Sequence, residues 1–272
     1  MISGNLAWRL LIAAIFIPLL LLVFHYGGIP FLVFVELLIA ISLLEFFSLL
    51  NLKLYFWQKL LLLIAALSPP LAIRFLGGDY LVEFILVVLF LTALPHVFSR
   101  ELGKIGRTIG LSFFGVLYLA ISYNCLILIR ETAIVPADLA AGWITFLFAT
   151  IWIADTAAYF VGFKLGKRKL APTVSPNKTV AGFVGGFVGA LLSAGIFHFI
   201  FLAQVGVGRL IVPSLLIALF GQLGDLVESV FKREAGRKDS SNLIPGHGGV
   251  LDRFDSLLFA APALYLYLRF IH

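Results

Sequence analysis

Residues 210–230 read LIVPSLLIALFGQLGDLVESV, an apolar run in which polar side chains become frequent only toward the end. The next residues, 231–255, read FKREAGRKDSSNLIPGHGGVLDRFD and form the most polar part of the chain. Residues 256–271, SLLFAAPALYLYLRFI, are apolar again. A helix needs about 20 mainly apolar residues to cross a bilayer. The stretch therefore predicts two membrane-spanning helices joined by a polar loop at one membrane edge.

Apolar segments of this kind recur along all 272 residues. The sequence is 61% hydrophobic and 12% charged, with a mean hydropathy of +1.08, which excludes an ordinary soluble domain. We predict an all-α polytopic integral membrane protein with about nine transmembrane helices, near residues 8–25, 30–51, 56–75, 81–98, 109–129, 141–162, 180–202, 210–230 and 256–271. The third is weak because Pro69 and Pro70 interrupt it, and the ninth because it is short. The first is interpreted as a retained span, since no small-residue cleavage site follows it.

The Lys and Arg residues divide unevenly between the two sides of this predicted bundle. With the N-terminus in the cytoplasm, 16 of the 20 lie on the cytoplasmic side. The four on the outer side are Arg74, Arg130, Arg209 and Arg269. This division follows the positive-inside rule. It predicts a cytoplasmic N-terminus, an outer C-terminus, and cytoplasmic positions for the two long polar loops, 163–179 and 231–255.

The chain is basic overall, with a net charge of +6 and a pI of about 9.5. In a soluble protein this balance would suggest a nucleic-acid partner. In a polytopic protein, basic residues set the topology and contact anionic lipid, so we predict contact with the lipid bilayer and no nucleic acid. The single cysteine, Cys125, excludes an internal disulfide framework.

The chain divides into two parts of different character. Residues 1–140 have short loops and scattered polar residues, typical of a transmembrane scaffold of about five helices. Residues 141–272 hold both long basic loops and several acids within spans, and are predicted to form a catalytic part of about four helices. Overlapping G-x-x-x-G pairs, Gly182 with Gly186 and Gly185 with Gly189, let another helix approach closely. We favour packing within the chain, with a homodimer contact as the alternative.

Acidic residues within membrane spans are costly and indicate function. Asp225 and Glu228 lie on the eighth predicted span, where helical spacing places Gln222, Ser229 and Lys232 in the same polar stripe. A structural seam would explain the glutamine and the serine but hardly two carboxylates. We interpret the stripe as part of a functional site that opens at the cytoplasmic edge.

Other acids within the spans are less informative. Glu36, Glu45 and Glu83 have no motif around them, so interhelical hydrogen bonding or snorkelling explains each as well as catalysis does. Asp155 and Tyr159 share one face of the sixth span at i, i+4 spacing. Because Asp155 lies about two helical turns inside the cytoplasmic end, we expect it to close the polar site from the opposite wall.

Asp252 and Asp255 are spaced i, i+3 at the start of the ninth span and can point the same way. Acids in a first helical turn also suit the helix dipole, which is the structural alternative. Mg²⁺ keeps several waters and binds through one or two carboxylates plus substrate phosphates, whereas zinc would need His or Cys ligands. We predict that Asp225 and Asp252 bind Mg²⁺, with room for a second cation. Weaker candidates are Asp155, Glu228 and Asp255.

The segment 245–249 contains three glycines, whose backbone N–H groups can turn toward an anion. Alone this signal is weak, because Gly-rich turns join many helices and a lone histidine is more often a satisfied polar residue. Basic side chains flank the segment on both sides, which favours a phosphate site. The residues predicted for it are Ser229, Lys232, Arg233, Lys238, His247, Gly248, Gly249 and Arg253.

The other cytoplasmic loop offers a second anion site. Ser175, Lys178 and Thr179 directly precede the seventh span. Thr179 can cap that helix, and Lys178 stands at its positive N-terminal end. We predict that these three residues bind substrate phosphate. The basic run upstream, Lys164, Lys167, Arg168 and Lys169, is interpreted as a topology signal that contacts lipid headgroups.

Together these residues resemble the signature of the phosphatidate cytidylyltransferase (CDP-diacylglycerol synthase) family. That signature leads from a serine through Lys-Arg and Lys-Asp pairs to His-Gly-Gly and Asp-Arg-x-Asp. The chain fills it without a gap at Ser229, Lys232, Arg233, Lys238, Asp239, Ser241, Ile244, His247, Gly248, Gly249, Asp252, Arg253 and Asp255. The resemblance reaches back through Asp155, Tyr159 and 175–179 and covers about 120 residues. One departure is Ala181, where the family pattern has glutamate.

The resemblance implies a Mg²⁺-dependent nucleotidyltransferase of phospholipid biosynthesis that converts CTP and phosphatidate to CDP-diacylglycerol and pyrophosphate. It implies the inner membrane of a bacterium, with the active site facing the cytoplasm. Two anions must meet in this reaction, so a metal and clustered cations fit. A phosphate monoester is nearly doubly charged already and needs no strong base. The predicted catalytic residues are Asp225, Lys232, Arg233, His247, Asp252 and Asp255.

Two other functions fit parts of the sequence. A CTP-dependent kinase of a polyprenol or another lipid alcohol would share the membrane fold and the cytoplasmic site. A cation-coupled transporter would explain the acids within the spans, but neither the polar loop nor its glycines, and the chain lacks evident inverted repeats. A CDP-alcohol phosphotransferase is disfavoured, because its motif of spaced aspartates is missing from the sequence.

Overall fold

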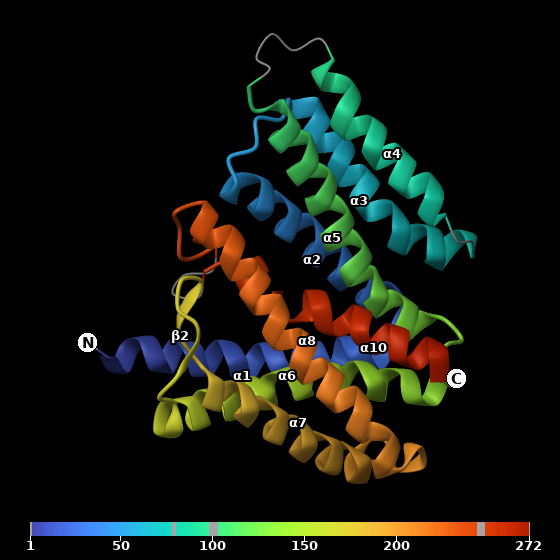
Figure 1. The fold of residues 1–272 in the computed structure, drawn as a ribbon. Coiled ribbons are helices and arrows are strands. Elements are labelled where there is room, and N and C mark those ends of the chain that lie inside the picture. Colours follow the sequence, from blue (N-terminus) through green and yellow to red (C-terminus); the bar gives the residue numbers. More distant parts are fainter. Residues whose placement is uncertain (1, 78–79, 98–102, 244–247, 272) are drawn as a thin grey trace.

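The computed structural model describes residues 2–77, 80–97, 103–243 and 248–271, with side chains described from residue 14 onward (Figure 1). Within these ranges the chain is almost entirely helical. The helices are α1 (Ile2–Tyr26), α2 (Gly28–Leu49), α3 (Phe56–Leu76), α4 (Leu81–Ala93), α5 (Ile105–Glu131), α6 (Ala137–Leu165), α7 (Val180–Ile200), α8 (Val207–Glu234), α9 (Leu251–Phe254) and α10 (Leu257–Ile271). The 3₁₀ turns η1 (Leu94–His96) and η2 (Ala203–Val205) follow α4 and α7.

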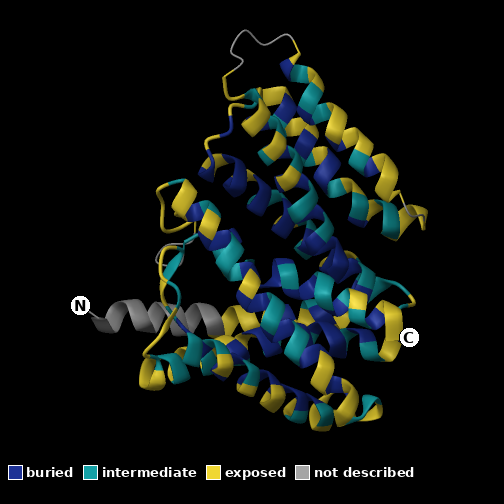
Figure 2. Cartoon of the chain, in the orientation of Figure 1, coloured by how far each residue is buried: buried dark blue, intermediate teal, exposed yellow. Residues whose placement is uncertain are grey.

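Seven helical segments of the described chain are long and apolar enough to cross a membrane. They are α2, α3, α5, α6, α7, α8 and the combined segment Leu251–Ile271, and the shorter apolar helices are Ala14–Tyr26 and Leu81–His96. Exposed residues run along the outward faces of the helices (Figure 2), and many carry large apolar side chains. Such an exterior is suited to contact with lipid. The all-α polytopic membrane architecture is confirmed, and the count of nine spans stays a prediction.

The two spans with the weakest sequence signal differ in the structure. Helix α3 continues through Pro69 and Pro70. Pro69 cannot donate to the carbonyl of Ala65, and Ser68 Oγ donates to that carbonyl instead, at 2.8 Å. The ninth predicted span, 256–271, corresponds to α10, and the short helix α9 precedes it across a turn where the backbone N–H of Ser256 donates to Asp255 Oδ1 at 2.6 Å. The break in this helical segment therefore lies beside Asp252 and Asp255, whereas the proline pair does not break α3.

The glycines of α7 pack inside the chain. A Cβ atom on Gly185 would lie 2.6 Å from Val161 Cβ, and one on Gly189 would lie 2.7 Å from Ala157 Cβ, both on α6. On the neighbouring face of α7, a Cβ on Gly186 would lie 2.8 Å from Gln222 Nε2 of α8. Only glycine permits these close helix approaches. The glycine pairs thus serve packing within the chain, as favoured, and homodimerisation stays a prediction.

The loop 163–179 contains a small β-hairpin that the sequence analysis did not predict. Strand β1 (Lys169–Ala171) pairs antiparallel with β2 (Ser175–Thr179), with Lys169 opposite Thr179 and Ala171 opposite Ser175. Neither strand shows the alternation of apolar and polar residues that marks a half-buried strand. In Figure 1 the hairpin and the C-terminal end of α8 lie on one side of the molecule, and the C-terminal end of α10 lies on the other.

The two parts predicted from sequence are joined closely. Helix α6 begins at Ala137, so the boundary between residues 140 and 141 falls within its first turns. Helix α5 of the first part packs against α2 and α3 and also against α10 of the second part. Helices from both parts therefore surround the polar residues described next.

Candidate functional site

The polar stripe of α8 is confirmed as one face of an unbroken helix. Gln222 is buried and donates through Nε2 to the carbonyls of Ala218, at 3.1 Å, and Phe183, at 3.4 Å. Glu228, Ser229 and Lys232 are also buried, although they stand near the end of the helix. Burial of so many polar groups requires partners, and other elements supply several of them, including Asp252 of α9 for Lys232.

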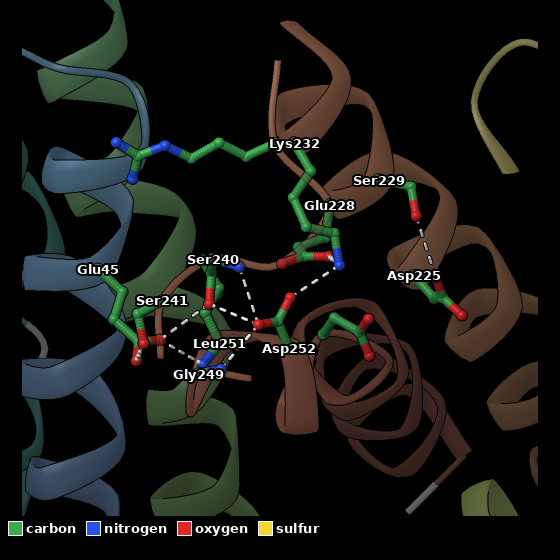
Figure 3. Close-up of polar contacts among 12 residues, drawn as sticks. Glu45, Asp225, Glu228, Ser229, Lys232, Ser240, Ser241, Gly249, Leu251 and Asp252 are labelled. Carbon is green, nitrogen blue, oxygen red and sulfur yellow. Dashed lines mark hydrogen bonds and ion pairs between the residues drawn. The ribbon is translucent and has the colours of Figure 1, made fainter. Parts of the chain in front are cut away.

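Lys232 lies at the centre of the site. Its ammonium contacts the Glu228 carboxylate one turn earlier on α8, and Asp252 Oδ1 of α9 at 2.8 Å (Figure 3). The exposed fractions of the three side chains are only 11%, 2% and 5%. Apart from this ion pair, neither Glu228 oxygen has a hydrogen-bond partner in the described chain. Two carboxylates thus share one ammonium in this cluster.

The second oxygen of Asp252 organises the polar loop before α9. Asp252 Oδ2 accepts hydrogen bonds from Ser240 N, Ser240 Oγ and Gly249 N, each at 2.8 Å. Gly248 has φ of +79°, and a Cβ there would lie 2.6 Å from Asp252 Oδ2. Glycine is therefore required at this position. The N–H of Gly249 donates to the Asp252 carboxylate, and contact of this N–H with a substrate phosphate stays a prediction.

The predicted anion site at Ser175, Lys178 and Thr179 contacts α8 through Lys178 and Asp225. Lys178 Nζ lies 2.7 Å from Asp225 Oδ2, and Ser229 Oγ donates to Asp225 Oδ1 at 3.3 Å. Thr179 caps α7 as predicted, because its Oγ1 accepts the N–H of Gly182 at 3.1 Å. The hairpin and the C-terminal end of α8, far apart in sequence, thus bring one lysine each to a carboxylate of this site.

Two further acids lie within electrostatic range of this site. Asp155 of α6 interacts with Asp225 and Lys178. Asp255, which follows α9, interacts with Asp225, Lys232 and Asp155. Asp155 is exposed, and its closing of the site from the opposite wall stays a prediction. Across the described ranges, however, no three His, Cys, Asp or Glu side chains converge closely enough to hold a metal by themselves.

The remaining predicted cations lie at the rim. Arg233 is exposed and donates through Nε to the Val174 carbonyl of the hairpin turn at 3.0 Å, and through Nη1 to the Arg237 carbonyl at 3.2 Å. Lys238 and Arg253 are exposed, and Ser175 is half-buried at the start of β2. His247 lies outside the described residues. Arg233 therefore joins the hairpin to the end of α8, and phosphate contacts of these residues stay predictions.

Sequence reasoning did not single out Glu45, a buried residue of α2. Its carboxylate accepts hydrogen bonds from Ser240, Ser241, Val250 and Leu251 in the polar loop and α9 (Figure 3). One signal could have separated it from Glu36 and Glu83. In the predicted topology only Glu45 lies near the cytoplasmic end of its span, at the same membrane edge as the polar loop.

Comparison with known proteins shows the family of this chain. The sequence pattern of a family described as the cytidylyltransferase family matches residues 7–271. A phosphatidate cytidylyltransferase of Bacillus subtilis (strain 168) is 36% identical over 254 residues, which cover 89% of this chain and 90% of that protein. Proteins of the same name from Staphylococcus saprophyticus and Staphylococcus aureus (strain COL) are each 47% identical, over 126 and 127 residues, covering 46% of this chain and 48% of each relative.

Proposed function

The chain belongs to the cytidylyltransferase family, and from that premise we propose that it converts CTP and phosphatidate to CDP-diacylglycerol and pyrophosphate. It is a nucleotidyltransferase of phospholipid biosynthesis in a bacterial membrane. The observation that carries the proposal is the meeting of Lys178 and Lys232 with Asp225 and Asp252 at the ends of α7, α8 and α9. Lys178 lies on β2 and Lys232 in the last turn of α8, so segments far apart in the sequence contribute to one charged site.

The charges suit a reaction between two anions. An oxygen of the phosphatidate monoester attacks the α-phosphorus of CTP, and the bond from that phosphorus to the departing pyrophosphate breaks. Ammonium groups placed beside the reacting phosphates lower the repulsion between them and stabilise the leaving group. Lys178 and Lys232 are the candidates, since both ammoniums already face the same group of carboxylates. A strong general base is not required, because the monoester is largely ionised near neutral pH.

We propose Mg²⁺ as the cofactor. The donor set fits it, because Asp225 and Asp252 supply oxygen ligands, and the buried Glu228 carboxylate has no hydrogen-bond partner in the described chain beyond its ion pair with Lys232. Two carboxylates are too few for calcium or zinc but suit Mg²⁺, which completes its shell with water and substrate phosphate. When bound, the ion would neutralise charge on the phosphates. Asp225 and Asp252 would bind it, and Asp155, Glu228 and Asp255 lie near enough to assist or to attract a second cation.

An assay of the purified protein tests the proposed reaction. Detergent-solubilised protein given CTP, phosphatidate and Mg²⁺ should release pyrophosphate and form CDP-diacylglycerol in equal amounts. A CTP-dependent lipid kinase would release CDP in place of pyrophosphate when given a lipid alcohol. Formation of CDP without pyrophosphate would contradict the proposed function and favour the kinase.

We predict that the polar loop faces the cytoplasm and that the C-terminus lies outside. The charge division supports this, as does the position of the C-terminus opposite the hairpin in Figure 1. Single cysteines at Asn242, which is exposed, and at His272 are to be placed in a Cys125→Ser background. A membrane-impermeant maleimide should label them from opposite faces of sealed vesicles. Labelling from the same face would mean an even number of membrane crossings between these two positions and would contradict the single span predicted there.

We predict that the rim cations near the polar loop matter more than the basic run 164–169. Alanine at Lys238 or Arg253 should lower kcat/KM tenfold or more, about 1.4 kcal/mol of barrier, because each removes a charge beside the phosphates. Alanine at Lys167 or Lys169, also exposed, should change it less than about threefold. Steady-state kinetics of the four variants checks this. Equal losses in both pairs would mean that the basic run 164–169 also belongs to the active site.

A further inference from the structure

Glu45 is the link between the first part of the chain and the polar loop. Its side chain is buried, with 6% of the residue exposed. Oε1 accepts from Ser241 Oγ at 2.6 Å and from Val250 N at 3.1 Å, and Oε2 accepts from Leu251 N at 2.8 Å and Ser240 Oγ at 3.2 Å. Three donors of its own and a fourth, the Ser240 hydroxyl, shared with Asp252 are a well-satisfied arrangement for a buried anion.

We propose that Glu45 is a positioning residue for the cytidylyltransferase reaction, acting on Asp252 through Ser240 and through the backbone at the start of α9. The inference rests on the proposed function and adds to it a residue from the part of the chain first interpreted as scaffold. Glu45 would not touch substrate. It would set where Asp252 stands relative to Lys232 and Asp225.

The geometry provides two routes from Glu45 to Asp252. Ser240 Oγ lies between the carboxylates, 2.8 Å from Asp252 Oδ2 and 3.2 Å from Glu45 Oε2, and its single hydrogen can serve only one of them at a time. The second route is the backbone, because Val250 and Leu251, whose N–H groups donate to Glu45, directly precede Asp252. Asp252 is thus held from both ends of the loop.

The packing around Gly249 leaves no room for a side chain at that position. A Cβ on Gly249 would lie 2.5 Å from Glu45 Oε2 and 2.1 Å from Ser240 Oγ. The carboxylate therefore fills the space where the loop passes α2, and glycine is required there. A glutamine in place of Glu45 keeps the size but turns an N–H₂ group toward donors, and an aspartate keeps the charge but is shorter by one methylene.

A purely structural role for Glu45 would be capping of α9, since an acid at a helix N-terminus stabilises the helix. That role predicts lower thermal stability of Glu45→Gln with an unchanged turnover per folded molecule. The positioning role predicts that kcat falls while substrate binding is kept, because Asp252 then stands in the wrong place during the reaction.

The experiment combines hydrogen exchange with steady-state kinetics on the full chain in detergent. Glu45→Gln should accelerate exchange in peptides covering 239–251 while leaving α8 peptides unchanged. It should also lower kcat about tenfold or more, with the KM values for CTP and phosphatidate within about threefold of wild type. Glu45→Asp should fall between wild type and Glu45→Gln. Glu36→Gln, a matched control on α2 whose two oxygens are buried without partners, should leave both exchange and kcat near wild type.

Unchanged exchange with kcat within about twofold of wild type would overturn the proposal. Faster exchange with unchanged kcat would also overturn it, in favour of capping alone. If Glu45→Gln fails to fold, the same measurements on Glu45→Asp and Ser241→Ala test the proposal. Ser241→Ala deletes one donor to Glu45 without placing a new group in the site. A wild-type protein that formed no CDP-diacylglycerol would contradict the proposed function, whereas wild-type turnover matched by Glu45→Gln would contradict only the role of Glu45.

Discussion

Asparagine at Asp252 or at Asp225 should lower turnover to less than about one tenth of wild type, a loss above about 1.4 kcal/mol of transition-state stabilisation. Asp252 accepts from Lys232 on one oxygen and from Ser240 and Gly249 on the other, and Asp225 faces Lys178. Asparagine removes the charge that each lysine, or a bound Mg²⁺, needs as its partner. It also presents an N–H₂ group to a donor. The measurement is CDP-diacylglycerol formation at saturating substrate.

Asp138→Asn is the matched control for the two aspartate variants. Asp138 is exposed in the first turn of α6, whereas Asp155 and the site lie toward the other end of that helix. The control should keep wild-type turnover, and all three variants should elute as folded protein in detergent. Turnover above about a tenth of wild type for Asp225→Asn or Asp252→Asn would remove that residue from the proposed site.

Replacing Lys232 with methionine should have the second large effect, on stability as well as on turnover. The ammonium stands between the carboxylates of Glu228 and Asp252, and all three side chains are nearly buried. Removing one partner of a buried ion pair leaves an uncompensated charge, at a cost of about 3–5 kcal/mol. We expect a lower midpoint of thermal unfolding in detergent and turnover reduced at least tenfold. Lys169→Met, at an exposed residue of β1, should change neither.

The double variant Glu228→Gln/Lys232→Met separates the two effects. Removing the Glu228 charge together with its partner should restore part of the lost stability, because one buried carboxylate no longer lacks a cation. Turnover should stay low, since no ammonium returns to the site. Recovery of turnover in the double variant would show that Lys232 acts only by neutralising Glu228.

Several features of the site follow from short-range patterns. The spacing of Asp225, Glu228 and Lys232 predicts one helical face, and α8 carries them on such a face. Thr179 before an apolar run predicts a helix cap, and its Oγ1 accepts the predicted kind of hydrogen bond. These inferences succeed because helix periodicity and capping depend on residues within a few positions of each other.

Other features required knowledge of which helices are neighbours. Nothing near Lys178 indicates that its ammonium meets Asp225 of another helix. The hairpin in 163–179 was missed because its strands are short and pair with each other, and no apolar face marks them. Glu45 was given the same weight as Glu36, although their environments differ completely in the structure.

Sequence alone determined the class of this protein, the apolar helices, the polar loop beside α8 and the family to which its motif belongs. Hydropathy and helical spacing are properties of neighbouring residues, so they can be read without a fold. Only the tertiary structure decided which group each charge meets. Glu45 and Ser240 are 195 positions apart and become partners because α2 packs beside the loop before α9. A buried charged group needs a partner, and which group lies near enough depends on how the whole chain packs.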